Sequence, residues 1–145
     1  MVSFVKKSVE GVIKMKRREA REKAFQFLFQ IDINNNEPVA AIREYLDEQG
    51  QDDFLQTLIE GVTERKAEID DTIRTHLENW TIDRLAAVER TILRIAIYEI
   101  RYIDDIPPNV SINEAVELGK IYGDEKSGKF VNGVLSNVIN QGGQA

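Results

Sequence analysis

The sequence contains no cysteine and a single histidine, His76. The absence of thiols excludes disulfide bonds, thiolate zinc sites and cysteine nucleophiles. One imidazole without a second imidazole or a thiol is a poor ligand set for a transition metal. We therefore predict no metal centre. A cysteine-free chain is compatible with a reducing cytoplasm, which is the location we expect.

Long apolar runs are also missing. No stretch approaches the roughly 18 apolar residues that a membrane-spanning helix needs. Charged side chains interrupt the apolar positions of residues 1–14, so this segment lacks the apolar core of a signal peptide. We expect no membrane association. We interpret residues 1–14 as a non-native or flexible extension, residues 15–141 as one domain, and residues 142–145 as a frayed tail.

The sequence lacks the short motifs that carry common enzyme chemistry. It has no glycine-rich phosphate loop, no nucleophile elbow and no calcium-loop spacing. Its paired carboxylates lie beside expected loops, so we interpret them as helix caps and solvated helix ends rather than acid–base pairs. These pairs are Asp52–Asp53, Asp70–Asp71 and Asp104–Asp105. We therefore predict a binding protein with no catalytic residue and no cofactor.

What the sequence has in abundance is apolar residues at helical spacing. Apolar residues make up 42% of the chain and charged residues 30%, which is typical of a globular protein. The spacing predicts one bent helix or two over residues 52–79, and a helix over residues 85–103 that is apolar almost all round and so central. Further helices are expected over residues 18–34, 38–49, 111–122 and 130–139. The pattern predicts an all-α fold, a single compact domain of six to seven helices in two halves.

Local signals place several helix ends. Asp52 or Asp53 suits an N-cap. The pair Ser111 and Glu114 has the spacing of a capping box. Gly123 is predicted to stop a helix in the left-handed conformation. Gly61 falls inside a helical pattern, where it either allows another helix to approach closely or costs about 1 kcal/mol relative to alanine.

Charge is distributed unevenly along the chain. Residues 1–23 hold eight Lys or Arg against three Asp or Glu, a net charge of +5. Residues 24–145 hold eleven against twenty-two, a net charge of -11. An acidic body with a basic arm favours an anionic partner at the arm alone.

Two basic groups are candidate phosphate contacts. The first, Lys16, Arg17, Arg18 and Arg21, lies at a helix start, where positive charge opposes the helix dipole and so favours a partner over a structural role. The second comprises Lys126, Ser127, Lys129 and Phe130, near the start of the last helix. Phe130 either stacks on a base or packs in the core. If the first and last helices pack side by side, both groups line one groove for nucleic acid. The alternative for the basic start is a solvated helix end.

Four blocks of the sequence resemble the NusB family of bacterial transcription antitermination factors. They are RREAREKAFQFLFQ, ERTILRIAIYEI, IPPNVSINEAVELGKIYG and KFVNGVLSNV, and the resemblance spans residues 16–140. It implies an all-α fold of two packed three-helix halves. It also implies binding of single-stranded boxA RNA together with a NusE-like small-subunit ribosomal protein. By the same resemblance, other Nus factors and RNA polymerase are expected to complete the complex, which would promote complete transcription of rRNA operons. Both basic groups match RNA-contacting segments of the family.

The resemblance further implies a protein-partner surface at Phe29, Glu89 and Arg94. Core packing beside Phe25 is the alternative for Phe29, and a solvated helix face is the alternative for the other two. Glu19 interrupts the basic start, where an unbroken arginine run would be a stronger phosphate site. This departure argues against Glu19 as a contact and favours weaker RNA binding by the protein alone.

Two other functions stay open from the sequence. The first is a helical protein-interaction module in which RNA contact is secondary. The second is a small-molecule enzyme, which requires convergent titratable groups in a pocket. The sequence does not decide between a monomer and a homodimer.

Overall fold

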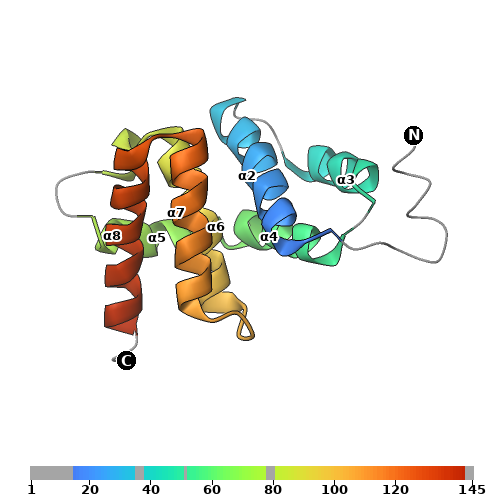
Figure 1. Ribbon diagram of the computed structural model, residues 1–145. Coiled ribbons are helices and arrows are strands. Elements are labelled where there is room, and N and C mark those ends of the chain that lie inside the picture. The colour runs from blue at the N-terminus through green and yellow to red at the C-terminus, as the bar shows by residue number, and fades with distance from the viewer. Residues whose placement is uncertain (1–14, 35–37, 51, 78–80, 143–145) are drawn as a thin grey trace.

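The computed structural model describes residues 15–34, 38–50, 52–77 and 81–142, and within them every regular element is helical (Figure 1). The elements are α2 (Arg17–Asn34), α3 (Pro38–Glu48), α4 (Asp53–Glu64), α5 (Lys66–Thr75), the 3₁₀ turn η1 (Ile82–Arg84), α6 (Ala87–Tyr102), α7 (Pro108–Tyr122) and α8 (Glu125–Gly142). The all-α prediction is confirmed. The predicted extension, residues 1–14, lies outside the described residues. Within them, no helix is long and apolar enough to cross a membrane.

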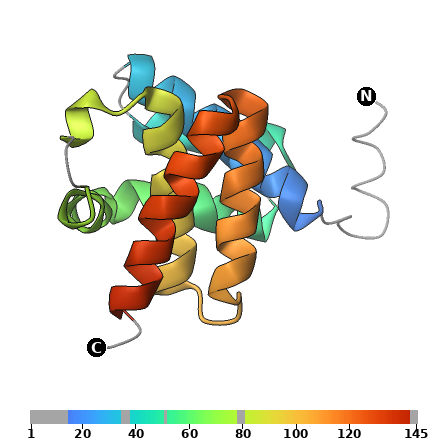
Figure 2. The ribbon, with the colours of Figure 1, turned by 60° about the vertical axis from the view of Figure 1, so that its left-hand side comes forward.

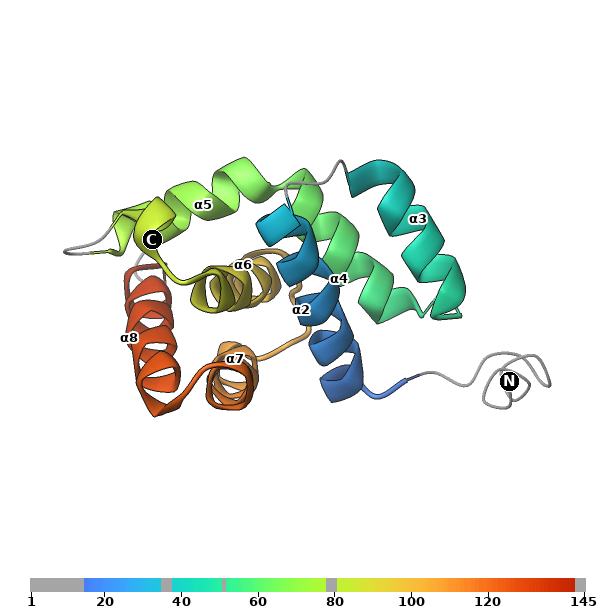
Figure 3. The same ribbon diagram turned by 90° about the horizontal axis from the view of Figure 1, so that it is seen from above.

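Helix α6 is the centre of the structure. It packs against α2, α4, α5, α7 and α8, and Figure 3 shows these helices arranged around it. Every residue from Thr91 to Ile97 is buried, as expected for a helix that is apolar almost all round. Helices α2 to α4 form one half, α6 to α8 form the other, and α5 packs on α6 between them.

The two halves share one hydrophobic core. Residues with almost no exposed surface come from α4 (Leu55, Leu58), from α6 (Leu93, Ile97) and from α8 (Leu135). Helices α7 and α8 lie side by side and run in opposite directions (Figure 2). Because burial is continuous across the halves, the hydrophobic effect holds them in one arrangement.

Two of the local predictions are confirmed near α4. Asp52 is its N-cap, since Oδ1 accepts a hydrogen bond from the Leu55 N–H at 2.9 Å, while Oδ2 accepts from the Met15 N–H at 3.1 Å. Gly61 allows a close approach, because a Cβ placed there would overlap the ring of Tyr98. The pattern over residues 52–79 is two helices, separated at Arg65.

The predicted capping box is wrong. Helix α7 begins at Pro108, three residues before Ser111, because proline suits the first helical position. The Ser111 hydroxyl instead donates to Glu99 on α6 at 2.7 Å. Glu114 turns outward and accepts two hydrogen bonds from Arg18 on α2.

The end of α7 also differs from the prediction. Gly123 has φ -117°, so it is not left-handed. Glycine is needed there for space, since a Cβ would lie 2.5 Å from the Ser127 hydroxyl. Helix α8 then begins at Glu125, with the Ser127 N–H donating to Asp124 at 2.9 Å. Helix α8 therefore starts five residues before the helix expected over residues 130–139.

Candidate nucleic-acid interface

The start of α2 presents three exposed cations, Lys16, Arg17 and Arg18. Arg18 makes a bidentate ion pair with Glu114 of α7, with distances of 3.1 Å from Nε and 3.0 Å from Nη2. Hydrogen bonding to Glu114 raises the pKa of Arg18 further above its ordinary value. Arg17 is 3.9 Å from Asp105, and its guanidinium lies 4.5 Å from the centroid of the Phe54 ring. Lys16 has no carboxylate partner among the described residues.

Arg21 has a different place from the one predicted. It is 5% exposed, and its guanidinium group donates to both carboxylate oxygens of Glu99, from Nε at 2.8 Å and from Nη2 at 2.9 Å. Glu99 is 1% exposed and also accepts from Ser111, so the group connects α2, α6 and α7. Arg21 is therefore not available to an external phosphate, and it acts as a support for the start of α2. A signal was present in the sequence, because Arg21 precedes Ala24 and Phe25 by three and four residues, which places it on their face of the helix, and Glu99 lies in an apolar run.

The second basic group divides in the same way. Lys126 and Lys129 are exposed on the first turns of α8, whereas Ser127 is 8% exposed at the contact with α7. Phe130 is half-buried and packs against the core.

Lys120 on α7 is a third exposed lysine that the prediction missed, and its Cγ lies 3.1 Å from the position that a Cβ of Gly128 would occupy. The cap at Asp124 stays ionised, since the backbone N–H of Ser127 holds the pKa of that carboxyl below its ordinary value.

The two basic groups do not meet in one groove between the terminal helices. Helix α7 lies between α2 and α8 (Figure 3). Arg18 contacts α7 at Glu114, whereas α8 begins just beyond the end of α7, where Tyr122 accepts from Gln26 at 2.8 Å. Gly123 comes nine residues after Glu114, which corresponds to about 13 Å along a helix axis.

Two of the predicted partner residues, Phe29 and Glu89, are half-buried. Phe29 packs against the core and stacks on Phe25 with a centroid distance of 5.6 Å. Glu89 lies in the first turn of α6, where its charge complements the helix dipole. Part of each side chain remains on the surface.

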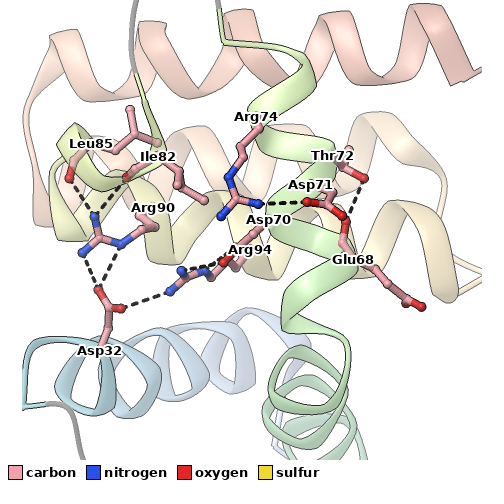
Figure 4. A network of polar contacts seen from close by, with 10 residues as sticks. All are labelled: Asp32, Glu68, Asp70, Asp71, Thr72, Arg74, Ile82, Leu85, Arg90 and Arg94. Carbon is pink, nitrogen blue, oxygen red and sulfur yellow. Dashed lines mark hydrogen bonds and ion pairs between the residues drawn. The ribbon is translucent and has the colours of Figure 1, made fainter.

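Arg94, the third predicted partner residue, is buried in an ionic network (Figure 4). Its Nε and Nη2 donate to Asp70 of α5 at 2.8 and 3.0 Å, and its Nη1 donates to Asp32 of α2 at 3.1 Å. Arg94 therefore faces the interior, not a solvated strip, and Asp70 is not the solvated helix end that the sequence suggested.

Arg90 completes the network. It donates to Asp32 at 2.7 Å and to the carbonyl oxygens of Leu85 at 2.9 Å and Ile82 at 3.3 Å. Burial raises the pKa of Asp32, but hydrogen bonds and charge from Arg90 and Arg94 outweigh burial and hold it below the ordinary value. The network fixes the end of α2 against α6.

Comparisons with known proteins show the family to which the chain belongs. The model of the NusB family matches residues 18–140. The transcription antitermination protein NusB of Oceanobacillus iheyensis is 62% identical over 125 residues, covering 86% of this chain and 99% of that protein. The protein of the same name from Bacillus pumilus is 57% identical over 126 residues, covering 87% and 96%.

Solved structures of NusB proteins also resemble this chain in sequence and fold. A crystal form of T. maritima NusB has a TM-score of 0.79 at 38% identity and covers 88% of this chain and 93% of that one. A crystal structure of the antitermination factors NusB and NusE in complex with dsRNA contains a chain with a TM-score of 0.77 at 34% identity, covering 86% and 96%.

Proposed function

We propose, from the premise that this chain belongs to the NusB family, that it is a transcription antitermination factor which binds RNA together with a NusE-like ribosomal protein. One solved relative is held in a complex with NusE and double-stranded RNA. The observation that carries the proposal for this chain is the set of exposed cations on an otherwise acidic body, at the start of α2 and at the junction of α7 and α8.

The finer assignment follows the family resemblance. The RNA is single-stranded boxA RNA of a nascent transcript, and the outcome is complete transcription of rRNA operons. Other Nus factors and RNA polymerase join the same complex in the cytoplasm. Phe29 and Glu89, which keep part of their surface exposed, are the remaining candidates for contact with the ribosomal protein.

The structure allows a sharper set of RNA contacts than the sequence did. Lys16, Arg17 and Arg18 form the first cluster, and Lys126 and Lys129 form the second. Lys120 extends the second cluster. Arg21 and Ser127 leave the contact set because they are buried, and their role is to hold the helices that carry the exposed cations.

A salt series tests the proposal. We expect boxA-type RNA to bind with a log–log salt slope of about -4, since one phosphate contact at each of the six exposed cations of a single-strand site predicts that value. A scrambled RNA of equal length is the control. A flat salt response, or equal binding of the scrambled RNA with and without the ribosomal protein, would count against the RNA function.

A further inference from the structure

Two concavities on the described surface have similar volumes but different linings. One, of about 460 Å³, lies between α3 and α4 and is lined by aliphatic and polar side chains such as Leu46 and Glu60. The other, of about 430 Å³, lies where the start of α2 meets α4 and the end of α6. Both volumes fall within the roughly 300–1,000 Å³ of small-ligand sites. Only the second is lined by aromatic rings.

The walls of this second concavity hold three half-buried rings and a planar cation. The rings are Phe54, Tyr98 and Tyr102, and the two tyrosines stack with a centroid distance of 5.4 Å. Arg17 also lines the space, with its guanidinium 4.5 Å from the centroid of the Phe54 ring and half of its side chain exposed. The packing of Arg17 on a ring gives it a defined plane as well as a charge.

We propose that this concavity is a subsite for one unpaired nucleobase of the bound RNA, next to a phosphate contact at Arg17. The proposal rests on the proposed RNA function and adds a base-recognition site to it. Unpaired bases stack on aromatic rings and on arginine planes, and both kinds of surface line this one space. Lys16 and Arg18 flank Arg17 in sequence, so the backbone of the same strand has cations beside the concavity.

Carboxylates of the lining give the subsite a base preference. Both oxygens of Asp52 are occupied, by the N–H groups of Met15 and Leu55. Asp53 and Asp104 are exposed, and neither carboxylate has a hydrogen-bond or ion-pair partner among the residues that the structure describes, so their oxygens are available to a ligand. A carboxylate accepts a hydrogen bond from an exocyclic amino group, which cytosine, adenine and guanine carry and uracil lacks. The subsite therefore favours an amino-bearing base over uracil.

A cationic side chain from a protein partner fits this concavity less well. Arg17 already lies over Phe54, and Arg65 lies 4.5 Å from the centroid of the Tyr102 ring. The faces of these two rings that would attract an incoming ammonium or guanidinium group are therefore already covered by cations of this chain. A flat neutral base can instead stack on the arginine plane itself.

An abasic scan of the RNA tests the subsite in the full-length chain. A boxA-type RNA 12-mer and twelve copies, each with one abasic nucleotide, are compared by fluorescence anisotropy. We expect one position at which loss of the base weakens binding about tenfold. In Arg17→Lys, which keeps the charge but removes the plane, that position should become insensitive while the salt slope stays the same. Arg43→Lys, at the other concavity, is the matched control and should behave like the unchanged protein.

A second variant tests the base preference. Replacing the base at the sensitive position by uracil should weaken binding to the unchanged protein, and Asp104→Asn should reduce that difference at least threefold. The proposal is overturned if no abasic RNA binds the unchanged protein more weakly than the intact RNA does. It is also overturned if Arg17→Lys weakens the binding of every abasic RNA by the same factor as that of the intact RNA. Weaker binding of the ribosomal protein by Arg17→Lys in the absence of RNA would overturn it as well. Absence of any RNA binding by the unchanged protein is a different result, because it removes the RNA function itself.

Discussion

The arginines at the start of α2 and those inside the molecule have the same chemistry and opposite uses. Arg18 pairs with Glu114, but 69% of its side chain is exposed, so solvent and salt screen the pair. Arg21, less than one helical turn further along, pairs with a carboxylate that is almost completely buried. The position of the partner carboxylate therefore decides whether an arginine is available to a ligand or holds the fold.

The largest expected effect comes from breaking the buried pair. Glu99→Ala leaves Arg21 and Ser111 without their acceptor, and we expect the free energy of unfolding to fall by about 3–5 kcal/mol. Urea unfolding followed by circular dichroism measures this. Ser111→Ala, which removes one neutral donor, should cost about 1 kcal/mol. A loss below 1 kcal/mol for Glu99→Ala would show that the buried pair does not hold the fold.

The network at the end of α2 predicts a pH dependence. The folded-state pKa of Asp32 is depressed by Arg90 and Arg94, so its contribution is present above the ordinary pKa of 3.8 and is lost as pH falls through the lower folded value. We expect Asp32→Asn to cost about 2 kcal/mol at pH 7, because hydrogen bonds to charged groups are lost.

Urea midpoints measured from pH 7 to pH 2 check this expectation. The difference between Asp32→Asn and the unchanged protein should shrink as the medium becomes more acidic than pH 4. Asp71→Asn, at an exposed pair with Arg74, is the control and should give a small difference throughout. A difference for Asp32→Asn that is constant with pH would contradict the assignment.

The exposed cations should behave differently from the buried ones. Lys126→Ala is expected to weaken RNA binding about fivefold at low salt and to lower the salt slope by about 0.7, since one phosphate contact is lost. Its unfolding midpoint should not change. Lys66→Ala, an exposed lysine at the start of α5, provides a control for net charge. Equal losses for both variants would show that only overall charge matters.

The smallest expected effect concerns Glu114. Because this carboxylate occupies the fork of Arg18, it competes with an RNA phosphate, and Glu114→Gln should tighten RNA binding about twofold to threefold at low salt. Glu64→Gln, on α4, removes the same charge at an exposed residue outside both cation clusters and should have less effect. Weaker binding by Glu114→Gln would mean that the carboxylate positions the arginine and does not compete with RNA.

Much of the helical fold could be predicted from local pattern. The apolar residues on almost every side of the helix expected over residues 85–103 placed α6 at the centre. The Asp52 cap could be predicted because it involves only residues adjacent in the sequence. Gly61 was open to two interpretations, and the contact with Tyr98 decides between them. These features depend on spacing within one helix or between adjacent segments, which a single sequence contains.

The division of the basic groups could not be predicted in the same way. The partner of Arg21 is 78 residues away in the chain, and Arg94 is 24 residues from Asp70. Their burial depends on how α5, α6 and α7 pack, which periodicity does not specify. The single groove failed for the same reason, because no local pattern showed that α7 would lie between the terminal helices.

The contacts of α6 with both halves have a consequence for how the protein loses its structure. Neither half retains a closed interior once α6 is withdrawn, so thermal melting should be a single cooperative event for residues 15–142. Amide hydrogens of α6 should exchange with deuterium only when the whole chain opens, whereas those of α3, whose main packing neighbour is α4, should exchange first.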